Sequence, residues 1–347
     1  MGDSLDDVGS DPDRQNNLAD QSDPPQHSRL WSLGGLLVVV VVALLLVPIP
    51  FKGRVTSAIG DLVHAPLFGG LTLAILGLMH RFLPQPPTGG DLIRRCAIVG
   101  FGVFTFGVSM EIMQHVSVRS GNLHDAVANG LGIIAALLFF LATRQKARWP
   151  GLLWLRIALL GFAAVALAFA WLGPARMIWD DYAMKRSFPK LASFDSNIEI
   201  TRFYFRECSG TLSTQDATDG TYAMSVSYQG TQNPSFTLVE LQRDWSNMQS
   251  FEMDVTLDDS YPADEVDFAF SILDEHHANY ATDLFHRIWK LQPGKTVRVS
   301  VSRNDILGGP QDREMDLTQI KFVDMGLNQP VAPTTVRFDS ITLQLRD

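Results

Sequence analysis

Residues 110–132 read MEIMQHVSVRSGNLHDAVANGLG and separate two long apolar segments. The stretch gathers glutamate, glutamine, histidine, arginine, aspartate and asparagine side chains. An ionisable group at the centre of a membrane helix costs roughly 2.5 kcal/mol or more on insertion scales. Several such groups at the end of one apolar segment and the start of the next therefore indicate that the protein uses them.

The apolar segments on either side belong to a series, each near the ~20 residues that a ~30 Å hydrocarbon core requires. The series covers residues 30–47, 60–82, 92–116, 123–142 and 152–172. We therefore expect an α-helical multi-pass membrane domain of about five transmembrane helices over residues 30–172. The preceding residues 1–29 are polar and acidic, and they predict a disordered tail because they can bury little apolar surface.

Lysine and arginine are distributed unequally between the two sets of loops, and the richer set is expected on the cytoplasmic side. The loops on the side of the N-terminus hold eight such residues, against three in the short loops on the other side. Four more follow the last apolar segment, which weakens the bias without reversing it. The prediction is a protein of the cell (inner or plasma) membrane, with a cytoplasmic N-terminus and an extracytoplasmic C-terminal region.

Charge divides the chain in the same way as hydropathy. Residues 1–29, 30–190 and 191–347 carry net charges of −5, +8 and −12, which together give the total of −9. An acidic C-terminal region argues against nucleic acid as a partner, because nucleic acid requires a basic surface. The two cysteines, Cys96 and Cys208, provide neither a disulfide framework nor a metal-thiolate motif.

From about residue 194 the pattern changes to short runs of alternating apolar and polar residues, such as SFEMDVTL and TVRVSVS. Gly, Pro, Asn and Asp separate these runs, which is typical of antiparallel strands. Residues 194–347 therefore predict an all-β sandwich of the jelly-roll type, with residues 173–193 as the connector.

The polar groups of the apolar region fall on helix faces. Gly100, Gly107, Glu111 and Gln114 share one face of the third segment, where small residues let another helix approach closely. The predicted polar cluster consists of Asp61, His64, Glu111, Gln114, Arg119, Asp125 and Asn129. Two interpretations have similar weight. The cluster is either a functional site or a structural network, in which Asp125 favours a helix start and Arg119 extends to headgroups.

In their order and spacing these residues resemble the VanZ-like family of small bacterial membrane domains. The resemblance covers roughly residues 30–145 and rests on Asp61-x-x-His64, Glu111-x-x-Gln114, Arg119, Asp125, Asn129-Gly130 and Gly132. It implies a role in the bacterial cell envelope, since the family is named after a protein linked to glycopeptide resistance. It implies no settled chemistry, and His115 and His124 have no match in the family pattern.

The C-terminal region is similar to galactose-binding-like jelly rolls, the sandwich of many carbohydrate-binding modules. The similarity rests on short pieces: FDS at 194–196, RDWSNM at 243–248, LQPG at 291–294, DLTQI at 316–320 and FDSITL at 338–343. We expect Trp245 in the core. Candidate sugar-binding side chains are aromatic or planar polar groups, namely Tyr261, His276, His277, Tyr280, His286, Arg287 and Trp289.

Together these patterns favour an integral membrane protein that recognises an envelope glycan, glycolipid or glycopeptide-type ligand outside the membrane. No catalysis, cofactor or metal is expected, and the lipid bilayer and the glycan are the expected partners. Two alternatives stay open. One is an enzyme acting on a lipid-linked envelope precursor through Glu111, His64 and Asp125, and the other is a non-catalytic envelope assembly scaffold. A divalent cation held by His64, His124 and the carboxylates is a further alternative.

Overall fold

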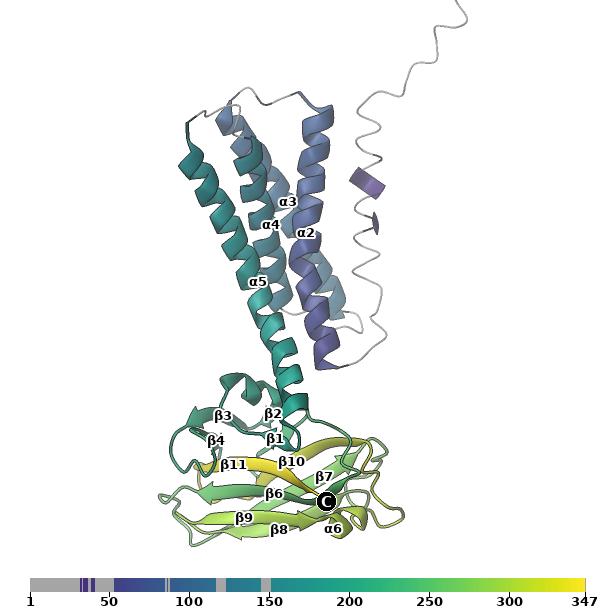
Figure 1. The fold of residues 1–347 in the computed structure, drawn as a ribbon, viewed down its shortest axis with the longest axis vertical. Coiled ribbons are helices and arrows are strands. Elements are labelled where there is room, and N and C mark those ends of the chain that lie inside the picture. The colour runs from purple at the N-terminus through teal and green to yellow at the C-terminus, as the bar shows by residue number, and fades with distance from the viewer. Residues whose placement is uncertain are drawn as a thin grey trace, which may run out of the picture. The chain divides into compact units, whose positions relative to one another are not determined.

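The computed structural model describes residues 53–84, 86, 88–116, 123–144 and 151–346, together with 32, 34–36 and 39–40. The chain divides into two compact units after Ala175, and each is described by itself. The first is helical and the second is a β-sandwich, in the order expected from the sequence (Figure 1). The predicted tail 1–29, most of the first predicted span 30–47, and Arg119 lie outside the described residues.

Within the described residues, four helices are long and apolar enough to cross a membrane. They are α2 (Arg54–Phe82), α3 (Gly89–Val116), α4 (Leu123–Arg144) and α5 (Leu153–Ser187). Four of the five predicted spans are thus helices. The last one continues to Ser187, well into the predicted connector.

Large apolar side chains cover the outside of these helices. Phe101, Phe162 and Phe169 are each at least 66% exposed. Many Ile and Val side chains of these helices are about half exposed. Contiguous apolar surface of this extent is unfavourable in water and indicates contact with lipid or another apolar surface. The four helices therefore have the surface, as well as the length, that a bilayer requires.

The closest approach between helices is that of α2 and α4. A Cβ atom on Gly132 would lie 2.1 Å from the carbonyl oxygen of Ala65, and one on Gly69 would lie 2.9 Å from the carbonyl oxygen of Gly132. Glycine at both positions lets the two backbones touch, as small residues do in membrane helix pairs. This contact fixes the depth at which side chains of α2 and α4 meet.

Helix α5 is joined to α2 by a hydrogen bond that a proline makes available. Pro66 has no backbone N–H, so the carbonyl of Leu62 lacks its usual partner within α2. The indole Nε1–H of Trp171 donates to that carbonyl oxygen at 3.2 Å. The hydrogen-bonding capacity of this carbonyl is thereby satisfied, and the middle of α5 is fixed beside the N-terminal part of α2.

Residues 176–346 are all described and form a sandwich of two antiparallel sheets, whose strand order fits a jelly roll. One sheet has the order β3 (Cys208–Ser213), β4 (Ala223–Tyr228), β11 (Thr334–Leu345), β6 (Met248–Leu257) and β9 (Thr296–Ser302), with β1 (Lys190–Ala192) also on β11. The other has the order β2 (Phe203–Arg206), β5 (Ser235–Leu238), β10 (Ile320–Asn328), β7 (Val266–Asp274) and β8 (Phe285–Leu291). A short helix, α6 (Arg303–Leu307), follows β9.

Aromatic side chains from both sheets form the core. Phe236 of β5 meets Phe338 of β11 edge-on with ring centroids 4.7 Å apart, and Phe268 of β7 lies 5.7 Å from the same ring. Trp245 is fully buried against Phe251, as expected from the sequence. These contacts join the two sheets across the sandwich.

The run IEIT, which alternates like a strand, is instead part of a 3₁₀ helix, η4 (Asn197–Arg202). The carboxylate of Glu199 accepts hydrogen bonds from the backbone N–H groups of Ser193 and Phe194. Arg202 forms a buried bidentate pair with Asp180 of α5, with N–O distances of 3.0 and 2.6 Å. These side-chain bonds outweigh the strand pattern, and within the second unit they hold residues 176–187 of α5 against η4.

The contact between α2 and α4 predicts the effect of a single methyl group. Gly132→Ala should force the helices apart and destabilise the helical unit by about 1–3 kcal/mol, the usual cost of overpacking. Gly70→Ala is the control, because a Cβ at Gly70 meets no atom within 4 Å. Thermal unfolding in detergent measures both variants, and equal stability of the two would contradict the described contact.

The buried pair between α5 and η4 gives a second prediction. Asp180→Ala leaves Arg202 buried without its carboxylate and should cost about 3–5 kcal/mol. Asp181→Ala removes only the pair with Lys185, whose side chain is largely exposed, and should cost about 0.5 kcal/mol or less. Denaturant unfolding of the sandwich unit compares the two variants, and a similar small loss in both would be evidence against the role of Asp180.

Candidate functional sites

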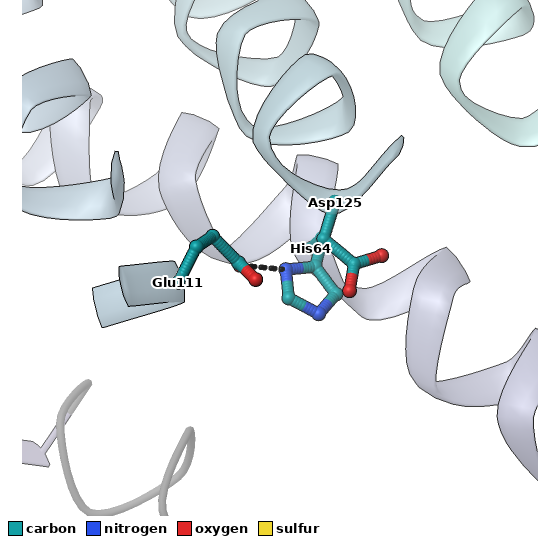
Figure 2. Close-up of side chains that lie close together, drawn as sticks. All are labelled: His64, Glu111 and Asp125. Atoms are coloured by element: carbon teal, nitrogen blue, oxygen red, sulfur yellow. Dashed lines mark ion pairs between the residues drawn. The ribbon is translucent and has the colours of Figure 1, made fainter. Parts of the chain in front are cut away.

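The polar cluster is formed where α2, α3 and α4 converge. Glu111 Oε1 lies 3.9 Å from His64 Nδ1, and both side chains are buried. Figure 2 shows the imidazole of His64 between Glu111 and Asp125, with each of the three side chains coming from a different helix. One potential ligand atom from each residue lies within 4.8 Å of the others. Three of the predicted site residues therefore meet at one point.

Asn129 completes this group from α4. Its side-chain Oδ1 lies 3.0 Å from His64 Nδ1, and the asparagine is only 1% exposed. An amide oxygen can only accept, so this bond requires a proton on Nδ1, and in a neutral imidazole the lone pair is then on Nε2. Asn129 thus orients the histidine ring and selects its tautomer.

No distance to His64 is established for the other predicted members of the cluster. Asp61 is half-buried one turn before His64 on α2, and His124, named in the alternative cation site, is exposed beside Asp125. The backbone of Gln114 belongs to α3, but its side chain is not among the described ones, and Arg119 lies outside the described residues. Their roles stay predictions.

The small residues expected beside the cluster lie at helix contacts. A Cβ on Gly107 would meet the ring of Phe68 at 2.9 Å and the amide Nδ2 of Asn129 at 3.6 Å. A Cβ on Gly100 would meet a methyl of Leu137 at 2.8 Å. Because glycine leaves this space free, α3 approaches α2 and α4 closely enough for Glu111 to reach His64.

A separate cleft of about 390 Å³ lies in the sandwich unit, beside β8 and α6. Its lining residues are Tyr280, Ala281, Thr282, Leu284, Phe285, His286, Asp305, Gly308, Gly309 and Gln311. The ring of Tyr280 is 72% exposed, and the polar groups come from His286, Asp305, Thr282 and Gln311. The cleft thus combines one open aromatic face with hydrogen-bonding groups.

The predicted sugar-binding residues divide between this cleft and the core. Tyr280 and His286 line the cleft. Arg287 lies next to it, paired with Asp305 at 3.1 Å and stacked over the ring of Trp289, with its guanidinium carbon 5.7 Å from the ring centroid. Tyr261 is buried, and its hydroxyl accepts a hydrogen bond from the N–H of Val331.

The remaining candidates have other neighbours. Trp289 is half-buried and packs edge-on against Phe270 in the core. His276 is exposed and pairs with Asp316 at 3.4 Å. His277 packs edge-on against the ring of Tyr280, with ring centroids 4.4 Å apart. Of Trp289, His276 and His277, it is His277 that has this ring contact with Tyr280, a residue that lines the cleft.

The loop that carries Tyr280 is held at its base by Arg313. The guanidinium of Arg313 donates to Asp274 Oδ1 at 2.7 Å and also lies 2.7 Å from Asp283 Oδ1. Asp283 Oδ2 in turn accepts from the N–H of Ala278, and its carbonyl oxygen lies 2.6 Å from His277 Nδ1. One cation thus fixes both ends of residues 274–283.

Sequence reasoning did not select Asp305, Gln311 or Arg313. Ser302 and Asp305 form the reciprocal capping box of α6, a spacing that the sequence shows as SRND. This spacing predicts where α6 begins. It does not predict the cleft, because the cleft depends on how α6 packs beside β8. Arg313 follows a Gly-Gly-Pro turn, and nothing local indicates its distant partner Asp274.

Comparison with known proteins gives no family for this chain. No protein-family model matches it, and no curated protein matches it. The resemblance to the VanZ-like family therefore rests on the residues named above alone.

Solved structures similar to the chain include two carbohydrate-binding modules and an enzyme. The family 11 module from Clostridium thermocellum, in complex with a beta-1,3-1,4-mixed-linked tetrasaccharide, is 14% identical, covers 45% of this chain and 94% of the module, and has a TM-score of 0.34. A family 22 module of Clostridium thermocellum is 13% identical over 45% of this chain and 92% of the module, with a TM-score of 0.32.

An exo-beta-agarase is 17% identical over 46% of this chain, with a TM-score of 0.37, and the chain spans a quarter of its length. At these identities and TM-scores the similarities assign neither a family nor a ligand.

Burial raises the pKa of the Asp274 carboxyl, but the hydrogen bonds from Arg313 and from the N–H of Asp316 outweigh this effect. Together they hold the pKa of Asp274 below the usual value of 3.8. A carboxyl with a lowered pKa in the folded state stabilises the fold above its unfolded value, and that contribution is lost as the pH falls through the folded pKa. The order of the loop should therefore depend on pH in the acid range.

Arg313→Ala tests this arrangement. At pH 7 it should destabilise the sandwich by about 3 kcal/mol, at the low end for a broken buried pair because Arg313 is partly exposed. The difference from wild type should shrink as the pH falls from the usual pKa of 3.8 through the lowered folded pKa of Asp274, because the carboxyl is protonated below that value. Thermal unfolding of wild type and variant at pH 7 and at a pH below 3.8 measures this difference in stability.

Arg243→Ala is the matched control, since its pair with Glu275 is exposed and should be worth about 0.5 kcal/mol or less. A loss for Arg313→Ala that is the same at both pH values would show that Asp274 is not the group through which Arg313 acts.

Proposed function

We propose that this chain is an integral membrane protein of a bacterial cell envelope whose β-sandwich binds an envelope glycan or glycolipid without catalysis. The observation that carries the proposal is the cleft beside β8 and α6. Sugars bind by stacking an apolar C–H face on an aromatic ring while their hydroxyls hydrogen-bond to planar polar groups. Tyr280 offers the ring, and His286, Asp305 and Gln311 offer the polar groups.

The size and order of the cleft support this use. A volume of about 390 Å³ lies at the lower end of the range for small-ligand sites, which suits one or two sugar rings. The Tyr280 loop is held by the charges of Arg313, Asp274 and Asp283. Because these bonds exist before a ligand arrives, less ordering entropy is lost on binding.

The membrane part of the proposal rests on the described helices. Four of them are long and apolar enough to cross a bilayer, and their outward side chains are largely apolar. The lysine and arginine distribution favours a cytoplasmic N-terminus, which would place the sandwich outside the cytoplasm. The resemblance of residues 30–145 to the VanZ-like family favours a bacterial envelope. An extracytoplasmic glycan would then be within reach of the cleft.

A glycan-array or polysaccharide pull-down with the full-length protein in detergent tests the proposal. We expect binding to one class of envelope glycan, and an approximately tenfold weaker affinity for Tyr280→Ala, as loss of a central aromatic contact costs more than about 1 kcal/mol. A fragment for confirmation should begin at Arg176, because a later start would remove Asp180, the buried partner of Arg202.

Tyr204→Ala is the control variant. Tyr204 is 61% exposed on β2, at the opposite edge of the same sheet from β8, so its removal should leave binding unchanged. Loss of binding in Tyr204→Ala with full binding in Tyr280→Ala would place the ligand on the sheet face and contradict the cleft. No binding by a demonstrably folded protein would refute carbohydrate recognition altogether.

A further inference from the structure

We infer that His64, Glu111 and Asp125 form a binding site for one divalent transition-metal ion, for which zinc is the best fit. The site would lie between α2, α3 and α4 (Figure 2). It does not depend on carbohydrate binding, because every residue that forms it belongs to the helical unit.

The spacing of the three side chains suits a metal of this size. Zinc binds histidine nitrogen at about 2.0–2.1 Å and carboxylate oxygen at about 2.0–2.2 Å in tetrahedral geometry, so two ligand atoms lie about 3.4 Å apart. The candidate ligand atoms already lie within 4.8 Å of one another. Side-chain rotations that bring these atoms closer by about 1.5 Å or less would place them around an ion.

The donor set selects the class of ion. One imidazole nitrogen with two carboxylates is typical of zinc and related transition metals, because imidazole is a poor ligand for hard cations. Calcium and magnesium prefer oxygen ligands, and calcium takes six or more of them. Three protein ligands leave a fourth position for water or another oxygen ligand, as in open zinc sites.

Asn129 supplies the second, independent observation. It accepts from His64 Nδ1, so in a neutral imidazole Nε2 carries the lone pair that a metal requires, which is the usual arrangement for an outer partner of a ligating histidine. Its own Nδ2 is buried and has no hydrogen-bond partner among the described residues. That N–H group lies near Gly107 of α3, one turn before Glu111, and would donate to an oxygen bound at the ion.

Charge balance also favours a cation at this point. His64 and Glu111 are less than one-tenth exposed, and Asp125 is half-buried at the same point between apolar helices. Two carboxylates this close repel each other strongly when water is excluded. A divalent ion bound between them would compensate this repulsion.

The test uses the full-length protein in detergent, stripped with a chelator and then titrated with zinc. We expect one zinc per chain by mass spectrometry of metals and by calorimetry. His64→Ala and Glu111→Gln should each weaken binding at least about 100-fold, more than the typical loss when only an outer partner is removed. Asn129→Ala should weaken it by about 10–100-fold.

His80→Ala is the matched control, since His80 lies at the other end of the same helix α2. Glu111→Gln keeps the shape of its side chain, and its circular dichroism and size-exclusion profile show whether it is folded. Cobalt(II) gives an optical readout, because its visible absorption reports direct coordination. We expect this absorption in wild type and His80→Ala, and its loss in folded Glu111→Gln and in His64→Ala.

Two results would overturn the inference. Zinc bound equally by wild type and by folded Glu111→Gln would show an adventitious site elsewhere on the protein. Absence of zinc and cobalt binding by folded wild-type protein at micromolar metal would show that the cluster is a hydrogen-bonding network without an ion.

Discussion

The contact between the backbones of α2 and α4 at Ala65 and Gly132 determines where the polar groups of the helical unit meet. His64 directly precedes Ala65, and Asn129 lies one turn before Gly132. Because the two helices touch at this depth, the imidazole and the amide come within hydrogen-bonding distance. A side chain larger than glycine at residue 132 would separate the helices and remove the contact that orients the histidine.

Buried charge is compensated differently in the two units. In the sandwich, Asp180 and Asp274 are each matched by an arginine that forms two hydrogen bonds, so the planar guanidinium provides both charge and geometry. In the helical unit, Glu111 and Asp125 lie beside a histidine whose proton is directed to Asn129. The proposed ion between them would have the role that those arginines have in the second unit.

Periodicity and composition predicted the helices, the sandwich and the small-residue face of Gly100 and Gly107, because these depend on local pattern. They did not predict β8 or β3. The inward positions of β8 include Arg287, which breaks the apolar alternation, and β3 consists mainly of small residues at a sheet edge. The sequence predicted one polar cluster that includes His64, Glu111 and Asp125, but not the distances between them, because these depend on how each helix is rotated.

Aromatic residues were a poor guide to the cleft, and strand geometry explains why. Trp289 and Phe268 are register partners, so the tryptophan shares the inner face of its sheet and packs toward the core. Tyr280 lies in a loop, where no strand alternation determines which way a ring faces. The ends of that loop are joined by Arg313 through carboxylates nine residues apart in sequence. The loop that carries Tyr280 thus depends on a cation distant in sequence, a relation that residue spacing alone does not reveal.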